Sequence, residues 1–474
     1  MATDAMSIRL KLNGIRVVAR IGRESSVPAG LTQLGGGTPW VHHRWHGYGM
    51  DRGRKREEHG SGFGMSESAC RSCGNRTLST FVDLGSTPLA NSYVDPSRAE
   101  DADSLYPLHA KVCQTCFLVQ LDHTVQPEQI FSDYAYFSSY SESWLDHARR
   151  FAKEVTADRS LGEDSLVLEI ASNDGYLLRN FADLSIPTLG VEPAKNVAAV
   201  AQEMGLETIV DFFDTKIANH IVRDKGQADL VVANNVVAHV PDLNGFIEGI
   251  RRVLKPGGAV SIEVPHLLRL IERVSFDTIY HEHFSYFSLL ALERVLQRHG
   301  LGVFDVEELG THGGSLRIWA AHREGTAEPS VRVRAVREAE ADAGLGTLEP
   351  YKHFSEQVHR CRTDFMSFLS DIKAAGKTMA AYGAAAKGNT FLNFCGVTSD
   401  HIDYVVDRSP HKQGLLLPGS RIPVREPGEV QRTQPDLLLI LPWNLKDEII
   451  EQMDVVRAWR GRFVVAAPRV EVTE

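Results

Sequence analysis

Cysteine is scarce in this chain, with 6 residues in 474. That number is too small for a disulfide scaffold, and four of the six fall in two close pairs. An excess of basic charge is also missing, because 51 Lys and Arg stand against 61 Asp and Glu, a formal net charge of −10. A general electrostatic affinity for nucleic acid is therefore not expected.

Long apolar runs are absent as well. No uninterrupted run is long enough to cross a bilayer, so the sequence predicts no membrane-spanning segment. No apolar stretch near the start leads to a small-residue cleavage site, so a secretory signal is a poor fit. We therefore expect a cytoplasmic protein.

The composition is that of a globular protein, with 43% hydrophobic and 24% charged residues. Its length suggests two to four domains. Residues 1–64 show no sustained helical or strand period. They are either a basic arm that binds a partner or, as we favour, a disordered extension, with Met65 as an alternative translation start.

The two cysteine pairs predict a metal site. Cys70 and Cys73 form one C-x2-C pair, and Cys113 and Cys116 form the second. Two such knuckles place four thiolates around one ion, the tetrahedral arrangement of structural zinc. A redox pair would need only one C-x2-C at the start of a helix. We expect a structural role, because four thiolates leave no open position for a substrate.

After Met65 the chain alternates strand-like and helix-like segments, which predicts βαβ units and a mostly parallel sheet. The strand predicted over residues 166–170 runs into the turn EIASNDG, residues 169–175. This turn resembles the E-x-G-x-x-x-G motif of class I methyltransferases, with Ala171 in place of the first glycine. The G-x-G-x-x-G fingerprint of dinucleotide folds is absent.

Two later strands extend this pattern. The strand over residues 188–191 ends in Glu192, which can accept hydrogen bonds from both hydroxyls of a bound ribose or can cap the next helix. The strand over 229–235 leads to a helix that ends in LKPGG, residues 254–258, before the strand AVSIEVP. This order resembles class I methyltransferases and favours methyl transfer over hydride transfer.

The segment YHEHFSYFS, residues 280–288, is the densest polar and aromatic cluster. If the segment turns, Tyr280 and His283 converge; if it is extended, its two histidines share one face. A neutral histidine is suited to removing a proton beside a ketone. A hydrogen-bonded aromatic core is the alternative, but polar clusters around His239 and Tyr134 favour catalysis.

A second α/β unit follows. Its predicted strand over residues 379–382 leads to GAAAKGNT, residues 383–390. Small residues let backbone N–H groups approach a phosphate, and Lys387 adds positive potential. The spacing is not that of a Walker A motif, and a tightly packed strand–helix turn is the alternative.

Seven blocks in register resemble the deoxysugar C-methyltransferase family, which methylates ring carbons of nucleotide-linked 4-keto sugars. The blocks are CRSCGN, VCQTC, DYAYFSSYSESW, EIASNDGYLL, NNVVAHVPDL, YHEHFSYFS and YGAAAKGNTFLN. The resemblance implies an α/β fold class with a small four-cysteine zinc-binding domain, a central class I Rossmann-like methyltransferase domain and a C-terminal Rossmann-like domain. The expected ranges are 65–126, 127–322 and 376–474, with a helical connector at 323–375.

The resemblance also implies roles for individual residues. His283 is the expected base, Tyr280 and His239 stabilise the enolate oxygen, Glu282 orients a histidine, and Tyr134 is a weaker candidate for the same pocket. The residues expected to bind S-adenosylmethionine are Glu169, Ala171, Asn173, Asp174, Gly175, Glu192 and Asn234. The residues expected to bind the sugar nucleotide are Lys387, Gly388 and Asn389.

The function implied is methylation of a ring carbon, C3, of a dTDP-4-keto-deoxysugar in antibiotic sugar biosynthesis. S-adenosylmethionine would donate the methyl group, and zinc would be structural. The alternatives are a C5-methyltransferase, an O- or N-methyltransferase of another small metabolite, and a non-catalytic zinc protein that binds nucleotides. The expected partner is a small-molecule substrate, and neither a nucleic acid nor a membrane.

Overall fold

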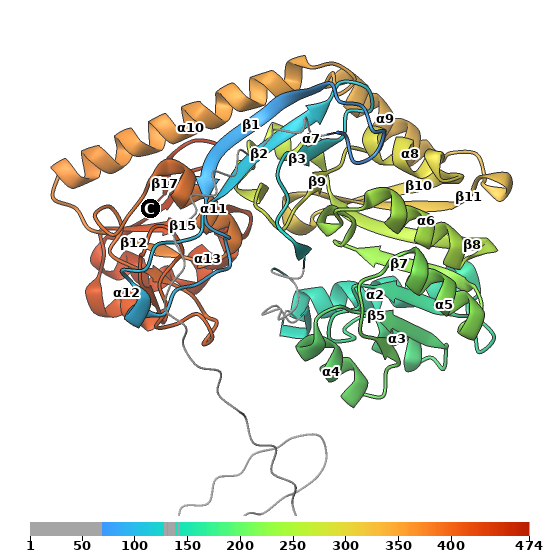
Figure 1. Ribbon diagram of the computed structural model, residues 1–474. Helices are drawn as coiled ribbons and strands as arrows, with labels where there is room; N and C mark the ends of the chain where they lie inside the picture. Colours follow the sequence, from blue (N-terminus) through green and yellow to red (C-terminus); the bar gives the residue numbers. More distant parts are fainter. Residues whose placement is uncertain (1–68, 128–129, 131–137, 141, 474) are drawn as a thin grey trace, which may run out of the picture. The chain divides into compact units, whose positions relative to one another are not determined.

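The computed structural model describes residues 69–127, 130, 138–140 and 142–473 (Figure 1). The predicted extension over residues 1–64 and the candidate Tyr134 lie outside these residues. Among the described helices, none has the length and apolar character that a membrane span requires.

The described helices and strands alternate through most of the chain. The strands are β1 (Leu78–Thr87), β2 (Tyr106–Cys113), β3 (Val119–Leu121), β4 (Val167–Ile170), β5 (Thr188–Val191), β6 (Thr208–Ile209), β7 (Ala228–Asn234), β8 (Leu254–Pro265), β9 (Ser285–Tyr286), β10 (Leu301–Leu309), β11 (Ser315–His322), β12 (Met379–Tyr382), β13 (Val405–Val406), β14 (Val424–Arg425), β15 (Leu437–Ile440), β16 (Arg462–Val465) and β17 (Glu471–Thr473). The α-helices are α2 (Glu142–Arg159), α3 (Leu178–Ala182), α4 (Lys195–Glu203), α5 (Thr215–Lys225), α6 (Leu243–Val253), α7 (Leu267–Glu272), α8 (Leu289–Arg298), α9 (Val331–Asp342), α10 (Glu349–Ala374), α11 (Ala386–Cys395), α12 (Gly428–Thr433) and α13 (Lys446–Gln452).

The central sheet has seven strands in the order β10-β11-β8-β7-β4-β5-β6. Strands β4 to β8 are parallel, and β11 pairs antiparallel with both β8 and β10. This order confirms the predicted class I methyltransferase fold. Because the chain moves outward from β4 on one side and then returns to β7 on the other, the strand order reverses beside β4, where α/β sheets bind ligands.

Local sequence explains how helix α6 is set against this sheet. Asp242 caps it by accepting a hydrogen bond from the Gly245 N–H at 2.9 Å, and its apolar side chains, including Phe246 and Ile250, are buried. The helix ends at Val253 and β8 begins at the next residue. The predicted LKPGG turn therefore lies within the start of the strand.

Most strands of the other two sheets come before or after the central sheet along the chain. The first, in the order β1-β2-β3-β9, is antiparallel and takes its last strand from far along the chain. The third, in the order β14-β13-β12-β15-β16-β17, is parallel except for the edge strand β17. It matches the predicted C-terminal Rossmann-like unit.

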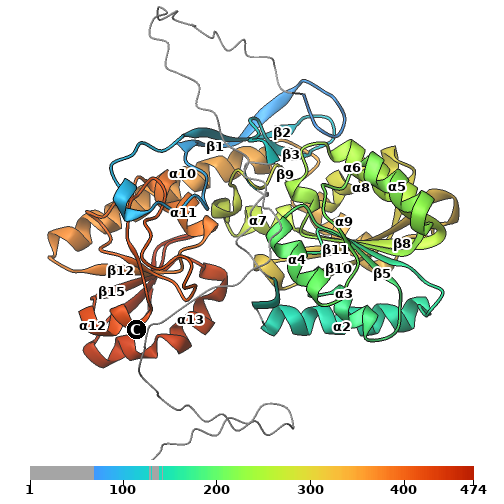
Figure 2. The same ribbon diagram turned by 60° about the horizontal axis from the view of Figure 1, so that its bottom comes forward.

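The predicted charged stretch between the α/β units forms the helices α9 and α10. Helix α10 runs beside β1 in both views (Figures 1 and 2). Phe81 on β1 stacks on Phe354 with ring centroids 4.5 Å apart and meets Tyr351 edge-on at 5.9 Å. These rings belong to one hydrophobic cluster that continues into β12 and α11.

Candidate active site

The four paired cysteines come together as predicted. Cys70 and Cys116 have their sulfur atoms 3.4 Å apart, and Cys73 and Cys113 have theirs 3.5 Å apart. All four sulfur atoms lie within 4.8 Å of one another. A tetrahedral zinc ion with bonds of about 2.3 Å needs sulfur separations of about 3.8 Å, so the cluster fits zinc. Four cysteine ligands fill all four positions of a tetrahedral ion and leave none open for a substrate, which suits a structural zinc ion.

The turn after β4 adopts the backbone that glycine usually provides. Ala171 and Asn173 have φ values of 59° and 50°, in the left-handed region. Asparagine tolerates this region, whereas alanine does so with strain. Gly175 has a φ of 77°, which favours glycine, and a Cβ atom there would also crowd Ala201 and Leu206.

The acidic residue after β5 is buried against this turn. The Glu192 carboxylate accepts hydrogen bonds from the Asn173 N–H at 3.0 Å and from the Ala194 N–H at 2.8 Å. Burial raises its pKa above the usual range. It therefore fastens the β4 turn and the entry to α4, and contact with a ribose remains a prediction.

The β4 turn also holds the chain that enters helix α2. The Asn173 Oδ1 atom accepts a hydrogen bond from the Ser138 N–H at 2.8 Å, and the Asp174 Oδ2 atom accepts one from the Ser139 N–H at 3.0 Å. Ser138 and Ser139 belong to the DYAYFSSYS block, whose Tyr134 lies outside the described residues.

Buried oxygen atoms gather at the carboxyl ends of β4 and β7. The side chains of Glu169 and Asn234 interact with Tyr176, whereas the Ser172 Oγ and Asp174 Oδ1 atoms have no hydrogen-bond partner among the described residues. Such atoms are costly unless a ligand or water satisfies them. S-adenosylmethionine carries a sulfonium, an ammonium group and ribose hydroxyls, so this acidic, acceptor-rich edge fits it. Burial raises the pKa of Glu169 well above its usual range, and a bound cation would lower it.

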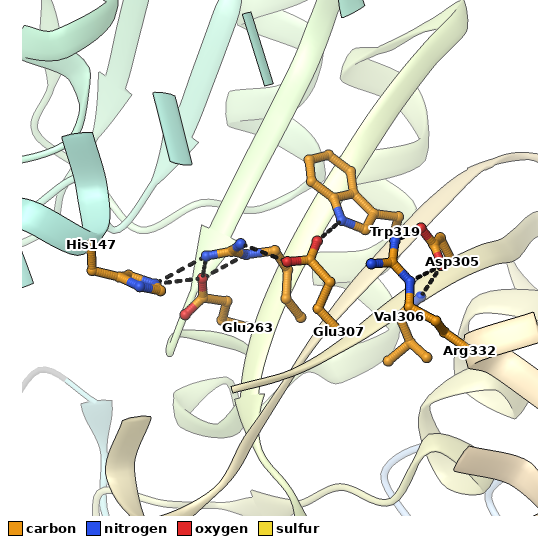
Figure 3. A network of polar contacts seen from close by, with 8 residues as sticks. His147, Glu263, Asp305, Val306, Glu307, Trp319 and Arg332 are labelled. Carbon is orange, nitrogen blue, oxygen red and sulfur yellow. Dashed lines mark hydrogen bonds and ion pairs between the residues drawn. The ribbon is translucent and has the colours of Figure 1, made fainter. Parts of the chain in front are cut away.

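A network of charged side chains lies near the carboxyl end of β8 (Figure 3). The Glu263 Oε1 atom on β8 accepts hydrogen bonds from the His147 Nε2 atom at 3.1 Å and from the Arg317 Nε atom at 2.8 Å. Burial alone would raise the pKa of Glu263, but the hydrogen bonds and charges of these two partners hold it below the usual range. The network joins α2 to β8 and β11 beside Asn234, which pairs with Glu263 in the sheet register.

Residues 280–283 form a turn, which is the arrangement expected to bring Tyr280 and His283 together. The His283 N–H donates to the Tyr280 carbonyl oxygen at 2.9 Å. This turn brings the Tyr280 hydroxyl to 3.1 Å from the His283 Nε2 atom. The His283 Nδ1 atom lies 2.8 Å from the Thr278 carbonyl oxygen, which can only accept, so Nδ1 carries the hydrogen.

That hydrogen bond decides the chemistry of the imidazole. With Nδ1 protonated, the neutral ring presents the lone pair of Nε2, and the Tyr280 hydroxyl donates to it. His239 lies beside it, with the ring centroids of His239 and His283 4.8 Å apart at 67°. The structure therefore brings together three of the predicted catalytic residues, His239, Tyr280 and His283.

Glu282 does not take the position expected for it. Among the described residues its hydrogen bond comes from the Asn91 Nδ2 atom, 2.5 Å from Oε1, and not from a histidine. The turn over residues 280–283 presents Tyr280 to His283 instead. Burial raises the pKa of Glu282 to about 7.

The segment that carries Asn91 also meets the C-terminal sheet. The Asn389 Nδ2 atom donates to the Ala90 carbonyl oxygen at 2.6 Å, and the Tyr93 hydroxyl donates to the Ala384 carbonyl oxygen at 2.5 Å. Asn389 thus has a partner within the chain. Gly388 is also packed, because a Cβ atom there would lie 2.9 Å from the Leu441 Cδ1 atom.

Lys387 carries a positive charge, unlike its neighbours Gly388 and Asn389. It stands in the first turn of α11, and its Nζ atom lies 5.7 Å from the centroid of the Trp443 ring. The Trp443 Nε1 atom donates to the Asp277 Oδ2 atom at 2.9 Å, just before the turn over residues 280–283. Of the three predicted substrate ligands, Lys387 alone brings a charge.

Three contacts of this site were missed by sequence reasoning. Thr278 acts through its carbonyl oxygen, so its side chain gives no signal. Asn91 lies in a loop without a recognisable motif. Arg71, whose Nη1 atom donates to the Phe284 carbonyl oxygen at 2.8 Å, lies inside the first cysteine pair, but the spacing predicted a role only for the cysteines around it.

Three family models match the chain in succession. A model described as "Putative zinc binding domain" covers residues 70–131, a "Methyltransferase domain" covers 141–306, and a "C-methyltransferase C-terminal domain" covers 310–468.

Several similar proteins are described as methyltransferases. The C-methyltransferase NovU of Streptomyces niveus is 36% identical over 403 residues, which are 85% of this chain and 96% of that protein. A ubiquinone biosynthesis O-methyltransferase of Paramagnetospirillum magneticum is 28% identical over 162 residues, covering 29% of this chain and 63% of that protein. Among solved structures, the magnesium protoporphyrin IX methyltransferase of Synechocystis PCC 6803 with bound SAM has a TM-score of 0.29 at 13% identity, covering 37% of this chain and 78% of that one. The near-complete match to NovU, with the three models in the same order, shows that this chain belongs to the family of S-adenosylmethionine-dependent C-methyltransferases with an N-terminal zinc-binding domain.

Proposed function

We propose that this enzyme methylates a ring carbon, C3, of a dTDP-linked 4-keto-deoxysugar by way of an enolate. The observation that carries the proposal is the hydrogen bond from His283 Nδ1 to the Thr278 carbonyl oxygen at 2.8 Å. It commits the neutral ring to a single tautomer with a basic Nε2, which is what removal of a proton beside a ketone requires.

Proton transfer then follows from the placement of three side chains. The carbon–hydrogen bond next to the ketone breaks, its proton goes to His283 Nε2, and its electron pair moves toward the carbonyl oxygen. The Tyr280 hydroxyl is 3.1 Å from Nε2, so one substrate can present its acidic carbon to the histidine and the adjacent carbonyl oxygen to the tyrosine. His239, whose ring lies against His283, would donate to the same oxygen.

The remaining step depends on the methyl donor. Bound S-adenosylmethionine would supply an electrophilic methyl group; its S–CH3 bond would break as the enolate carbon takes the methyl, which would leave S-adenosylhomocysteine and restore the ketone. The protein's part is to hold the carbon in line and to exclude water, since no further activation is needed.

Lys387 is the proposed contact for the nucleotide's phosphates. It lies in the first turn of α11, and the N-cap residue Ala385 provides no side-chain hydrogen bond to the helix start. Backbone N–H groups there, together with the ammonium of Lys387, suit a diphosphate. Gly388 and Asn389 would support this turn by packing and by the contact of Asn389 with Ala90.

The proposal is tested by incubating the enzyme with a panel of dTDP-4-keto sugars in D2O, without S-adenosylmethionine. Deuterium should enter the ring carbon beside the ketone, and NMR after addition of the methyl donor should place the new methyl on that carbon. His283→Asn keeps a donor for the Thr278 carbonyl oxygen but removes the base. It should slow both reactions by a factor of about 10² to 10⁴.

His281 is the matched control, because its Nε2 atom contacts the Tyr106 carbonyl oxygen at 3.2 Å, away from the His239–His283 pair. His281→Asn should retain both reactions. Methylation without deuterium exchange, or methylation of an oxygen or nitrogen, would overturn the enolate scheme. A methyl on C5 would keep the scheme and correct the position.

A further inference from the structure

Arg71 lies inside the first zinc knuckle but reaches the catalytic segment. Its Nη1 atom donates to the Phe284 carbonyl oxygen at 2.8 Å, and its Nη2 atom donates to the Leu121 carbonyl oxygen at 2.8 Å. Phe284 directly follows His283 in the sequence. One guanidinium thus ties the end of β3 to the residue after the proposed base, with two charge-assisted hydrogen bonds.

The Phe284 peptide is where several segments meet. Its N–H donates to the Ala238 carbonyl oxygen at 2.7 Å, next to His239. Its carbonyl oxygen accepts from the Leu121 N–H at 3.0 Å as well as from Arg71. Any displacement of this peptide would therefore move His239 and His283 relative to one another.

Arg71 itself is held from both sides. Its backbone N–H donates to the Gln120 Oε1 atom at 2.8 Å, and its carbonyl oxygen accepts from the Asn244 Nδ2 atom at 2.8 Å. Cys70 and Cys73, two of the four clustered cysteines, flank it. The base of the side chain is thus fixed by the knuckle, and only its tip meets the catalytic segment.

We infer that Arg71 is a positioning residue, which uses the rigid zinc knuckle to set the geometry of the His239–His283 pair. The inference rests on the proposed role of these histidines in proton removal. A displacement of about 1 Å in such a pair can cost about 10²-fold in rate. This gives the zinc-binding domain a part in catalysis without contact between the metal and the substrate.

The variants Arg71→Met and Arg71→Lys test this, with Arg294→Met as the matched control. Arg294 also donates to a knuckle, from Nη1 to the Thr115 carbonyl oxygen at 2.8 Å, but belongs to α8 and does not reach Phe284. Each variant is assayed for bound zinc, for S-adenosylmethionine affinity, for kcat and KM, and for amide hydrogen exchange of the peptide containing Phe284.

In Arg71→Met, the amide hydrogen of the peptide containing Phe284 should exchange about tenfold faster or more. The kcat should fall about 10- to 100-fold, while KM and the affinity for S-adenosylmethionine stay within about threefold of the wild type. Arg71→Lys should recover part of both effects through one restored hydrogen bond. Arg294→Met should change neither. If Arg71→Met loses zinc or fails to fold, the exchange rate and kcat of Arg71→Lys alone test the inference.

Unchanged exchange and kcat in the Arg71 variants that retain zinc would overturn the inference, and so would equal effects in Arg294→Met. Hydrogen exchange needs no substrate, so it separates the two proposals. Faster exchange at Phe284 in a protein that methylates no sugar of the panel would refute the proposed function and leave the positioning contact standing.

Discussion

Glu282 is a buried carboxyl whose titration is measurable in the stability of the protein. Burial raises its pKa from an ordinary value near 4.5 to about 7, against the lowering effect of the hydrogen bond from Asn91. Between these pH values the folded state holds a proton that the unfolded state has lost. Stability therefore falls as pH rises from about 4.5 through about 7, by roughly 3 kcal/mol in all.

Glu282→Gln should remove this loss. Relative to the wild type, the variant should gain roughly 2 kcal/mol of unfolding free energy between pH 5 and pH 8, because the glutamine does not ionise. Urea unfolding at the two pH values measures the difference. Any change in packing affects both pH values equally and cancels.

Glu248 provides the control for this prediction. Hydrogen bonds from Arg251 lower its pKa to about 2, so it stays ionised in both states between pH 5 and pH 8. Glu248→Gln should therefore change the unfolding free energy by the same amount at both pH values. A pH-independent effect of Glu282→Gln would show that this carboxyl titrates normally.

At the scale of elements, the polar contacts in Figure 3 include one buried ion pair and one at the surface, whose contributions to stability can be compared. Arg317 on β11 is 4% exposed and contacts Glu263, which is fully buried. Arg317→Met should cost about 3–5 kcal/mol, because it leaves the buried carboxylate of Glu263 without its arginine and with His147 as its remaining partner. Arg332 on α9 pairs with Asp305 at the surface, so Arg332→Met should cost about 1 kcal/mol or less.

Denaturant unfolding of the two variants measures this contrast. Since both substitutions replace an arginine by a methionine in the same part of the fold, the difference between them isolates burial. Equal losses of stability would contradict the assignment of β8, β11 and α2 to one buried network.

Elements with a strong local pattern were predictable from the sequence. The all-buried strand β4 and the helix α6 with its Asp242 cap carry their signals within a few residues. Strand β9 was not predictable, because it has two residues and takes β3 as its partner from far earlier in the chain. That pairing joins the segment that follows Tyr280 and His283 to the sheet of the zinc-binding region.

The same distinction holds for the site. The four cysteines, His239, Tyr280 and His283 were singled out from motifs, because thiols, imidazoles and phenols are side chains that bind metals or transfer protons, and the structure brings them together. The expected role of Glu282 and the contacts of Arg71 and Asn91 depend on which distant segments meet, which spacing along the chain does not encode. The Thr278 contact uses a backbone carbonyl, which every residue type provides.

At the scale of the whole molecule, the zinc cluster shares its core with the methyltransferase sheet. Cys70, Cys113 and Cys116 lie in the same hydrophobic cluster as β4, β7 and α6. Asn244 on α6 donates to the carbonyl oxygens of Arg71 and Ser72, at 2.8 and 3.1 Å. Loss of the metal should therefore weaken both regions together, and not release the zinc-binding region alone.

Cys73→Ser tests this coupling, because Cys73 is the least buried of the four ligands and its replacement disturbs packing least. Scanning calorimetry should show one transition lowered by about 10 °C, since structural zinc contributes several kcal/mol to folding. Cys361→Ser, a buried thiol outside the cluster that donates to the Ala466 carbonyl oxygen, should lower it much less. S-adenosylmethionine should raise the whole transition. A separate low-temperature transition, with the S-adenosylmethionine-sensitive one unmoved, would show that the two regions unfold independently.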